Sequence, residues 1–268
     1  MTKQRWASLG IDVDQPNPAR IYDYMLGGGH NFAADRAAAE QIEALLPGAR
    51  AILRCNRAFL RRAVLFLISA GVRQFLDIGS GVPTIGNVHE IAQRADEQAR
   101  VVYVDKEPVA VAHSRLLLAD NQRAAAVQAD MCEPDTVLRA PETRRLLNLD
   151  EPIGLLTVAV IHFIADEQRP PDVMAAYRDQ LAPGSYLALS HGDSATGSSE
   201  VAEVMELYKR SGNPVYPRSP REISALFAGF DLVEPGVVSA AQWQPESPSE
   251  LGPQTGHSEI YAGVGRKP

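Results

Sequence analysis

The sequence predicts an α/β protein built on a seven-stranded, mostly parallel sheet with helices on both faces. From Val72 onward, short apolar runs alternate with longer helical segments, which is typical of parallel strands joined by right-handed crossovers. The run over residues 153–161 is the most apolar, as expected for a central strand that is buried on both faces. A glycine turn at Gly79–Gly81 ends the first strand, at the edge of such sheets where ligands bind.

The composition is that of an ordinary globular protein, and it restricts the partners. Of 268 residues, 45% are hydrophobic and 22% are charged, and the formal net charge is -7. A negative chain is poorly suited to nucleic acid or to an anionic membrane surface, because both reward a basic face. No apolar run approaches the roughly 20 residues that cross a bilayer, and no secretory signal is visible. Cys55 and Cys132 lack metal-ligand spacing, so we expect a cytoplasmic protein without a metal.

The first 71 residues predict a helical cap ahead of the sheet. A short helical turn that carries Tyr22 and Tyr24 runs into three glycines, Gly27–Gly29, which are followed by His30 and Asn31. Because consecutive glycines lose much backbone entropy on ordering, this stretch is either a mobile connector or is held against another part of the molecule. Two helices are expected next, over residues 35–46 and 49–70.

Apolar residues recur along the second of these helices at the spacing of one buried face, and arginines occupy much of the rest. A run of charges on a helix usually forms a solvated face, and binding of an anion is the alternative interpretation. The arginines are Arg50, Arg54, Arg57, Arg61 and Arg62.

The remaining elements follow from the apolar pattern and the turn residues. Residues 240–256 are rich in Pro, Ser and Gly and are expected to form a loop, which carries Trp243. The predicted strands cover residues 72–78, 100–105, 124–129, 153–161, 185–191, 230–238 and 259–265. The predicted helices cover residues 87–99, 109–121, 134–148, 172–181, 200–210 and 220–227.

The end of the first strand has the features of a nucleoside site on a Rossmann-like sheet. Gly79 and Gly81 allow a tight turn against which a ligand can lie, and Asp105 closes the next strand, where an acidic residue meets ribose hydroxyls. The glycines alone are also compatible with a tight turn that binds nothing. A dinucleotide site would place a third glycine at Thr84, and Pro83 widens the turn, which favours a bulky group without a pyrophosphate.

Five segments of the sequence resemble one family, the S-adenosyl methyltransferase family long catalogued as a domain of unknown function. They are PNPARIYDYMLGGGHNFAADR, FLDIGSGVPTIGNVHE, VVYVDKEPVAVAHSR, ADMCEPD and AVIHFIAD. The similarity covers almost the whole chain, and the N-terminal pattern ARxYDYxLGGxxNF is more specific than the glycine turn. It implies a class I methyltransferase fold, with a cap over residues 1–71 and an S-adenosylmethionine-binding domain over residues 72–268.

The resemblance also implies where S-adenosylmethionine binds along the strand ends. The ribose hydroxyls are expected to bind Asp105, with Lys106 beside it. The residues expected to border the methionine part are Asp77, Gly79, Ser80 and Gly81.

Later strand ends and the cap are implied to complete this cofactor site. Asp130 and Met131 follow the third strand and are expected to frame the adenine. Val160 and Ile161 end the fourth strand and are expected beside the transferable methyl. The N-terminal signature is expected to close over the cofactor, because ligands sit outside the carboxyl ends of parallel strands. Its candidate residues are Tyr22, Tyr24, Gly28 and Asn31.

Two histidines, His162 and His191, close strands at this edge and are candidate general bases. A positioned base contributes about 10²–10⁴-fold to transfer onto a hydroxyl, and histidine changes its protonation near neutral pH. The alternative for each histidine is a structural hydrogen bond. His30, in the cap, is a weaker candidate of the same kind.

The predicted function is methyl transfer from S-adenosylmethionine to an oxygen or nitrogen of a small molecule. A nucleic acid acceptor is disfavoured because the chain is acidic and has no aromatic-interleaved basic patch. One alternative is a protein that binds the cofactor without transferring methyl. A second is an NAD(P)-linked oxidoreductase, against which Thr84 and the absence of a Tyr-x-x-x-Lys pair count. Trp243 is expected either to shape the acceptor pocket or to pin its loop to the core.

Overall fold

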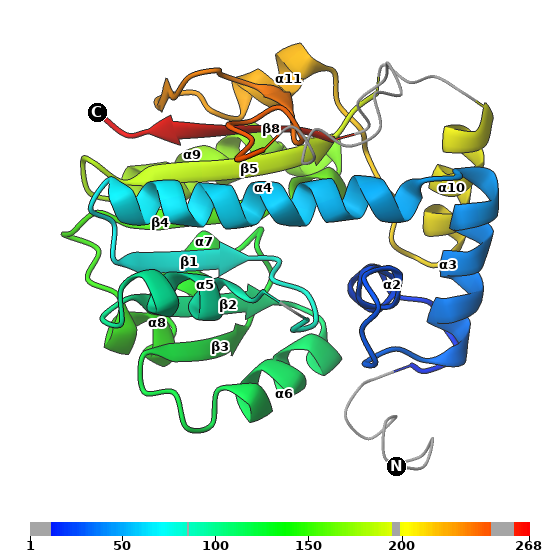
Figure 1. The fold of residues 1–268 in the computed structure, drawn as a ribbon, viewed down its shortest axis with the longest axis horizontal. Helices are drawn as coiled ribbons and strands as arrows, with labels where there is room; N and C mark the ends of the chain where they lie inside the picture. Colours follow the sequence, from blue (N-terminus) through cyan, green and yellow to red (C-terminus); the bar gives the residue numbers. More distant parts are fainter. Residues whose placement is uncertain (1–11, 85, 195–198, 248–259) are drawn as a thin grey trace.

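A mixed sheet organises the molecule (Figure 1). The computed structural model describes residues 12–84, 86–194, 199–247 and 260–268, and within these ranges eight strands form one sheet in the order β3-β2-β1-β4-β5-β8-β6, with β7 paired to β8. The order reverses between β1 and β4, where doubly wound sheets bind ligands. The strands are β1 Gln74–Ile78, β2 Arg100–Asp105, β3 Ala124–Gln128, β4 Gly154–Val158, β5 Tyr186–Gly192, β6 Asp231–Leu232, β7 Val238–Ser239 and β8 Ile260–Arg266.

Strands β1 to β5 run parallel to their neighbours, and β8 runs antiparallel to β5, as the arrows in Figure 1 show. The predicted α/β class, with its mostly parallel sheet, is confirmed. The strand expected over residues 230–238 is divided into β6 and β7, so the sheet has one strand more than the seven predicted. Pro235 lies between the two pieces and has no N–H for a strand ladder.

Successive residues of a strand point to opposite faces of the sheet, as the two-residue period of a strand requires. Phe75, Val101 and Tyr103 lie in one apolar cluster with α4, α5 and α6. Leu76 and Val102 lie in the other cluster, with α7, α8, α9 and α11. The helices of these layers are α4 Ala49–Ser69, α5 Val88–Ala95, α6 Pro108–Leu117, α7 Pro134–Arg139, α8 Pro141–Leu146, α9 Pro170–Gln180 and α11 Pro220–Ala225, with 3-10 turns η1 Ile161–Phe163 and η2 Asp166–Gln168.

The polar segment predicted as one helix over residues 134–148 forms two short helices, α7 and α8. Pro141 occupies the first turn of α8, where its missing N–H would have no partner. Pro141 also prevents α7 from continuing, because proline has no N–H for the next helical hydrogen bond and its ring clashes with the preceding turn. No helix in the described ranges combines the length and apolar content that crossing a membrane requires.

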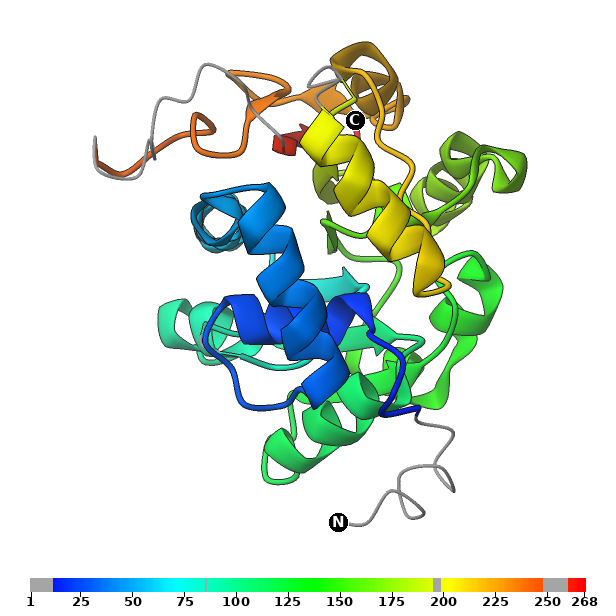
Figure 2. The ribbon, with the colours of Figure 1, turned by 90° about the vertical axis from the view of Figure 1, so that its right-hand side faces the viewer.

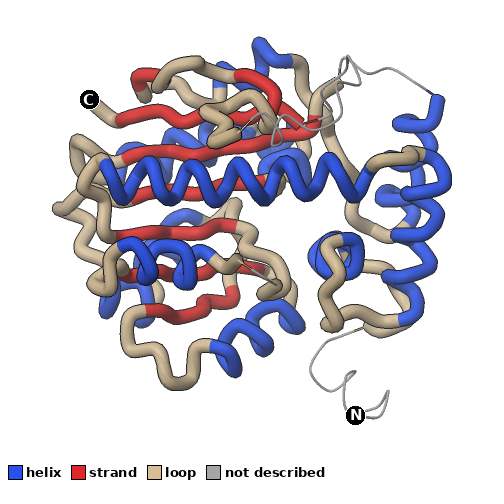
Figure 3. Tube along the Cα trace, viewed as in Figure 1, coloured by secondary structure: helices blue, strands red, loops and turns tan. Residues whose placement is uncertain are grey.

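Helix α4 is the longest element of the described chain, and it lies across the sheet (Figures 1 and 3). Phe59, Ala63 and Leu67 form its fully buried stripe. Arg62 is also buried and donates to Trp243 O at 2.8 Å and to Ala240 O at 2.7 Å, which ties the 240–243 turn to the helix.

Trp243 is a core residue and does not shape a pocket. Its exposed fraction is 0%, and its ring packs edge-on against Phe59 and Phe66 at centroid distances of 5.5 and 5.7 Å. The expectation that this side chain contacts the acceptor is therefore wrong, and the alternative, that it pins its loop to the core, fits the packing. Residues 248–256 of the predicted loop lie outside the described ranges.

Three helices form a separate layer beyond the carboxyl ends of the strands (Figures 1 and 2). They are α2 Pro18–Met25, α3 Ala33–Leu45 and α10 Ser199–Arg210, and we call them the cap. Ile21, Ala39, Ile42 and Leu207 form the centre of its apolar cluster. The cap in the structure therefore differs from the cap predicted over residues 1–71. Helix α4 packs on the sheet instead, and α10, from far along the chain, belongs to the cap.

Candidate active site

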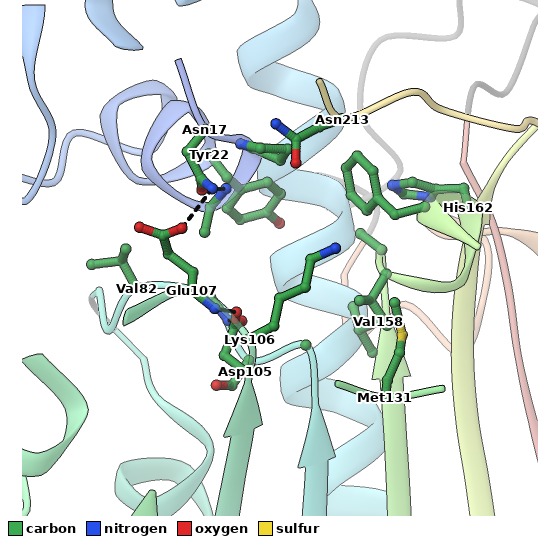
Figure 4. Close-up of a pocket in the computed structure, with 18 of the residues that line it drawn as sticks. Asn17, Tyr22, Val82, Asp105, Lys106, Glu107, Met131, Val158, His162 and Asn213 are labelled. Atoms are coloured by element: carbon green, nitrogen blue, oxygen red, sulfur yellow. Dashed lines mark hydrogen bonds between the residues drawn. The ribbon is translucent and has the colours of Figure 1, made fainter. Parts of the chain in front are cut away.

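A cavity of about 260 Å³ lies between the carboxyl ends of the strands and the cap (Figure 4). Its size is close to the lower end of small-molecule sites, which span roughly 300–1,000 Å³. One side, which we call the floor, consists of Asp77, the turn Gly79–Gly81 and Asp105. The cap contributes Asn17, Pro18, Ala19, Tyr22 and Tyr208 to the opposite side.

The glycine turn folds tightly onto the neighbouring strand. Gly79 N and Ser80 N both donate to Val104 O, at 2.8 and 3.1 Å. Gly79 has φ +67°, and a Cβ there would meet Val160 Cγ2 at 2.0 Å, so only glycine fits. Gly81 also has φ +67°, but its nearest neighbour, Ala19 Cβ, is 3.9 Å away. The turn therefore presents bare backbone to the cavity.

Asp105 braces this turn from the end of β2. Its Oδ2 accepts from Gly81 N at 2.7 Å, and its Oδ1 accepts from Glu107 N at 2.8 Å. Burial raises the pKa of this carboxyl, and the two backbone donors oppose the rise. Since each carboxylate oxygen can accept more than one hydrogen bond, Asp105 can hold the turn and still bind hydroxyl groups in the cavity.

Asp77 on the floor and Arg57 on α4 are two charged residues that line the cavity. Burial raises the pKa of Asp77 to about 7, Arg57 opposes the rise, and Asp105 adds to it. Arg57 projects from α4 and donates from Nη2 to Gly86 O at 3.2 Å and to Thr84 Oγ1 at 3.5 Å. A positively charged ligand would favour the ionised form of Asp77.

A buried ion cluster joins the cap to the sheet beside the cavity. Arg20 donates from Nε to Asp35 Oδ2 at 2.9 Å and from Nη1 to Glu107 Oε1 at 3.0 Å. Asn17, the N-cap of α2, donates from Nδ2 to Glu107 Oε2 at 2.8 Å (Figure 4). Glu107 follows β2 directly, so the cap is anchored two residues after Asp105. Lys106, between them, extends into the cavity (Figure 4).

A chain of buried hydrogen bonds positions Tyr22 over the strand ends. Asn56 Nδ2 donates to Tyr22 Oη at 3.2 Å, and Asn56 Oδ1 accepts from Ser190 Oγ at 2.6 Å. The same Ser190 Oγ accepts from Ala159 N at 2.9 Å. Ala159 has φ +55°, a left-handed conformation that is uncommon for alanine and is often found at functional sites. Residues from the cap, α4, β5 and the β4 end are thereby connected.

Aromatic side chains line the end of the cavity beyond β4. Phe163 lies between His162 and Tyr208, with ring centroids at 4.6 and 6.2 Å. Burial raises the pKa of Tyr208 to about 12, so its hydroxyl stays protonated. Asn213, after α10, adds a polar group to this wall, which Figure 4 shows facing Tyr22 and His162 across the opening.

His162 is neutral in this environment. Burial, with His191 and Arg218 nearby, lowers the pKa of His162 well below its usual range. Gly192 N donates to its Nδ1 at 3.4 Å, which leaves the proton of the neutral ring on Nε2. In this state the ring can donate a hydrogen bond to a ligand. The expectation that His162 acts as a general base does not fit this arrangement, because Nδ1 accepts from Gly192 N and Nε2 carries the proton.

The structure brings most of the predicted site residues to the cavity, from five segments of the chain. Those that line it are Tyr22, Asp77, Gly79, Ser80, Gly81, Asp105, Lys106, Met131, Val160 and His162. Those that do not are Gly28, Asn31, Asp130, Ile161 and His191.

Gly28 and Asn31 hold the loop between α2 and α3. Asn31 Nδ2 donates to Asp23 Oδ2 at 2.8 Å and to Gly28 O at 2.9 Å. A Cβ on Gly28 would lie 1.9 Å from Asp23 Oδ1, so glycine is needed there for packing against a buried carboxylate. The glycine run is thus held in place within the cap and does not reach the cavity.

His191 is part of a structural network. Its exposed fraction is 0%, its Nδ1 lies 2.8 Å from Gly192 O, and Arg218 Nη1 donates to its Nε2 at 2.9 Å. With both nitrogens engaged, and with burial lowering its pKa to about 4, the ring has no position from which to act as a base in the cavity. Ile161 packs in the core, and Asp130 Oδ1 accepts from Cys132 N at 2.8 Å.

Several lining residues were not predicted. Asn17 and Glu107 stand beside motifs that were recognised, and the N-cap spacing of Asn17 is a usable sequence signal. Arg57 was visible only as one of five arginines. Phe163 stands directly after His162, inside a segment that was recognised. Tyr208 and Asn213 come from a distant segment, and no local pattern distinguishes them from core or surface residues.

A strand order of 3-2-1-4-5 with an antiparallel last strand, and a cavity at the switch between β1 and β4, define a class I, Rossmann-like methyltransferase. The chain belongs to the S-adenosyl methyltransferase family, whose model matches residues 4–268. It is therefore an S-adenosylmethionine-dependent methyltransferase, and the oxidoreductase and non-enzymatic alternatives are wrong.

Solved structures agree over the whole chain. A candidate methyltransferase from Thermobifida fusca is 39% identical, with a TM-score of 0.91 and 98% of each chain covered. A DUF574 family protein from Streptomyces avermitilis is 38% identical, with a TM-score of 0.90 and coverage of 96% of this chain and 100% of that one. No curated protein matches the chain.

Proposed function

We propose that this enzyme methylates an oxygen or nitrogen of a small molecule held between the floor and the cap. The observation that supports the proposal is a single cavity with two different ends. One end has the bare glycine turn and the carboxylates of Asp77 and Asp105. The other has the rings of Tyr22, Phe163 and Tyr208. Such a mixture of apolar walls and a few polar groups is typical of small-molecule sites.

The floor fits S-adenosylmethionine on observations independent of the family match. Ser80 Oγ is buried and has no hydrogen-bond partner among the described residues, although it lines the cavity. Gly79 and Gly81 carry no side chain, so the backbone of the turn is open to the cavity. We propose that Asp105 binds the ribose hydroxyls, Met131 contacts the adenine, and Asp77 with the turn Gly79–Gly81 borders the methionine part. When bound, this cofactor supplies the activated methyl group.

The protein's contribution to the chemistry is alignment and exclusion of water. Tyr22, held by Asn56, covers the cavity from the cap, and Val160 packs against Gly79 at the end of β4. Alignment of two reactants in this way can be worth roughly 7–11 kcal/mol. We assign His162 the role of donating from Nε2 to the acceptor, since its neutral ring carries the proton there.

We also propose that the sheet and the cap have different roles in binding. The sheet with α4 holds the cofactor, and α2 and α10, packed against α3, supply the acceptor wall and the cover. The N-terminal part of the predicted cap, Tyr22 included, belongs to the site in this proposal, while Gly28 and Asn31 support it from within the α2–α3 loop.

A labelling experiment tests the acceptor class. The purified enzyme is incubated with cell extract and S-adenosylmethionine that carries a 13C methyl group, and the extract is then separated by size. We expect label in the low-mass fraction, with a methyl carbon chemical shift typical of an O-methyl or N-methyl group. Label that appears only on protein or nucleic acid would contradict the proposal. Extract treated with the His162→Ala variant controls for other methyltransferases.

A further inference from the structure

Arg57 is the one cationic side chain of α4 that lines the cavity. Its Nη2 holds the glycine-turn segment through Gly86 O and Thr84 Oγ1. Its Nε is buried and has no hydrogen-bond partner within the described ranges. A buried donor without an acceptor is unfavourable, and more so on a charged group. The vacant donor therefore indicates a ligand group that accepts hydrogen bonds.

The surroundings define the charge of that ligand group. Asp77 and Arg57 both line this cavity, and the charge of Arg57 opposes the effect of burial on the Asp77 carboxyl, so the two charges lie near each other. A cation and a carboxylate side by side match a zwitterion, with its anionic end on Arg57 and its cationic end on Asp77. The methionine part of S-adenosylmethionine is such a zwitterion, with one carboxylate and one ammonium.

The planar fork of a guanidinium can bind a carboxylate through two nitrogens at once. A ligand carboxylate at Nε would complete the hydrogen bonding of Arg57 while Nη2 keeps its contacts to the turn. Ser80 Oγ, the other buried cavity atom without a partner, can donate to the same ligand part. Lysine could supply the charge at this position but not the fork.

We propose that Arg57 is the residue that binds the carboxylate of the cofactor's methionine part. This assignment rests on the proposed cofactor position on the floor. Arg57 thereby orients the cofactor in the cavity and couples its binding to the glycine turn, which the same guanidinium holds. It is a cofactor-binding residue supplied by α4, outside the strand-end motifs that characterise the sequence.

The test compares two ligands that differ only in that carboxylate: S-adenosylmethionine and decarboxylated S-adenosylmethionine. Titration calorimetry of the wild-type enzyme should show about 10–100-fold weaker binding of the decarboxylated ligand, as expected for charge-assisted hydrogen bonds. Arg57→Gln should weaken S-adenosylmethionine by a similar factor and change the affinity for the decarboxylated ligand by less than about threefold. Arg57→Lys, which keeps the charge, should bind S-adenosylmethionine with an affinity between those of the wild type and Arg57→Gln. This variant guards against a fold defect in the glutamine variant.

Arg54→Gln is the matched control, because Arg54 is exposed three residues earlier on the same helix. It should bind both ligands like the wild type. Equal losses for both ligands in Arg57→Gln, or no loss for S-adenosylmethionine, would overturn the assignment of Arg57 and leave the proposed function intact. A wild-type enzyme that binds neither ligand in this cavity would contradict the cofactor site itself.

Discussion

The floor and the cap enclose the same cavity, but they are stabilised in different ways. The floor is continuous with the sheet: the turn at Gly79 donates to the backbone of β2, and Asp105 closes it. The cap has a small apolar cluster, which it shares with the start of α4, and it meets the end of β2 through polar groups, with Arg20 and Glu107 at the centre. This difference indicates that the floor depends on the backbone of the sheet, whereas the position of the cap depends on side-chain contacts.

The largest effect is expected where the cap is anchored. Arg20→Met leaves Asp35 and Glu107 buried without their cation, which should lower the free energy of cap opening by about 3–5 kcal/mol. Native-state hydrogen exchange of α2 amides measures this. Arg139→Ala, which breaks an exposed pair with Asp135, is the control and should change stability by no more than about 1 kcal/mol. Unchanged α2 exchange in Arg20→Met would mean that apolar packing alone holds the cap.

Trp243 belongs to neither region and separates effects on the core from effects on the site. Trp243→Ala should lower the free energy of unfolding by about 3–5 kcal/mol, because it empties a fully buried position. Cofactor affinity and turnover of the remaining folded enzyme should stay at wild-type values. Urea unfolding, calorimetry and initial rates below the unfolding transition measure the three quantities. A turnover defect in the folded variant would show that Trp243 contributes to the acceptor site.

The floor is tested by two glycines with the same φ. Gly79→Ala combines left-handed strain with a clash against Val160, and we expect a loss of about 2–5 kcal/mol in unfolding free energy. Gly81→Ala has the strain without the clash and should lose only about 1–2 kcal/mol. Denaturant unfolding of both variants gives the comparison. Equal losses would show that Val160 relaxes and that the turn is less tightly packed than described.

The last effect concerns the charge of the floor and depends on pH. Because the pKa of Asp77 rises from 3.8 in the unfolded chain to about 7 in the folded protein, the folded state retains a proton that the unfolded state releases. The free energy of unfolding of the unliganded enzyme should therefore fall as the pH rises from about 4 to about 7. Asp77→Asn removes this fall, so its unfolding midpoint should exceed that of the wild type by more at pH 8 than at pH 5.

The same substitution should weaken S-adenosylmethionine, since the neutral amide cannot pair with the ammonium group. Asp135→Asn, at an exposed position on α7, is expected to show neither effect. A midpoint difference that does not change with pH would refute the titration of Asp77.

The contrast between floor and cap also explains what the sequence could predict. The strand that carries Asp77 near its end and the acidic residue at 105 are local patterns, and the structure places both at one cavity. The composition of the cap depends on the apolar face of α10 meeting α2 and α3, which no local pattern reveals. His191 shows the same limit, because its ring is engaged by Arg218, 27 residues later in the chain.

Hydrogen–deuterium exchange with and without S-adenosylhomocysteine tests most directly whether floor and cap form one cofactor site. The unreactive product allows exchange to be followed without turnover. We expect added protection in two places: the turn at residues 79–82, and the cap residues that line the cavity, in α2 and at 208–214. Protection confined to the glycine turn, with exchange in α2 unchanged, would contradict the account. It would show that the cap lies beside the cofactor site without being part of it.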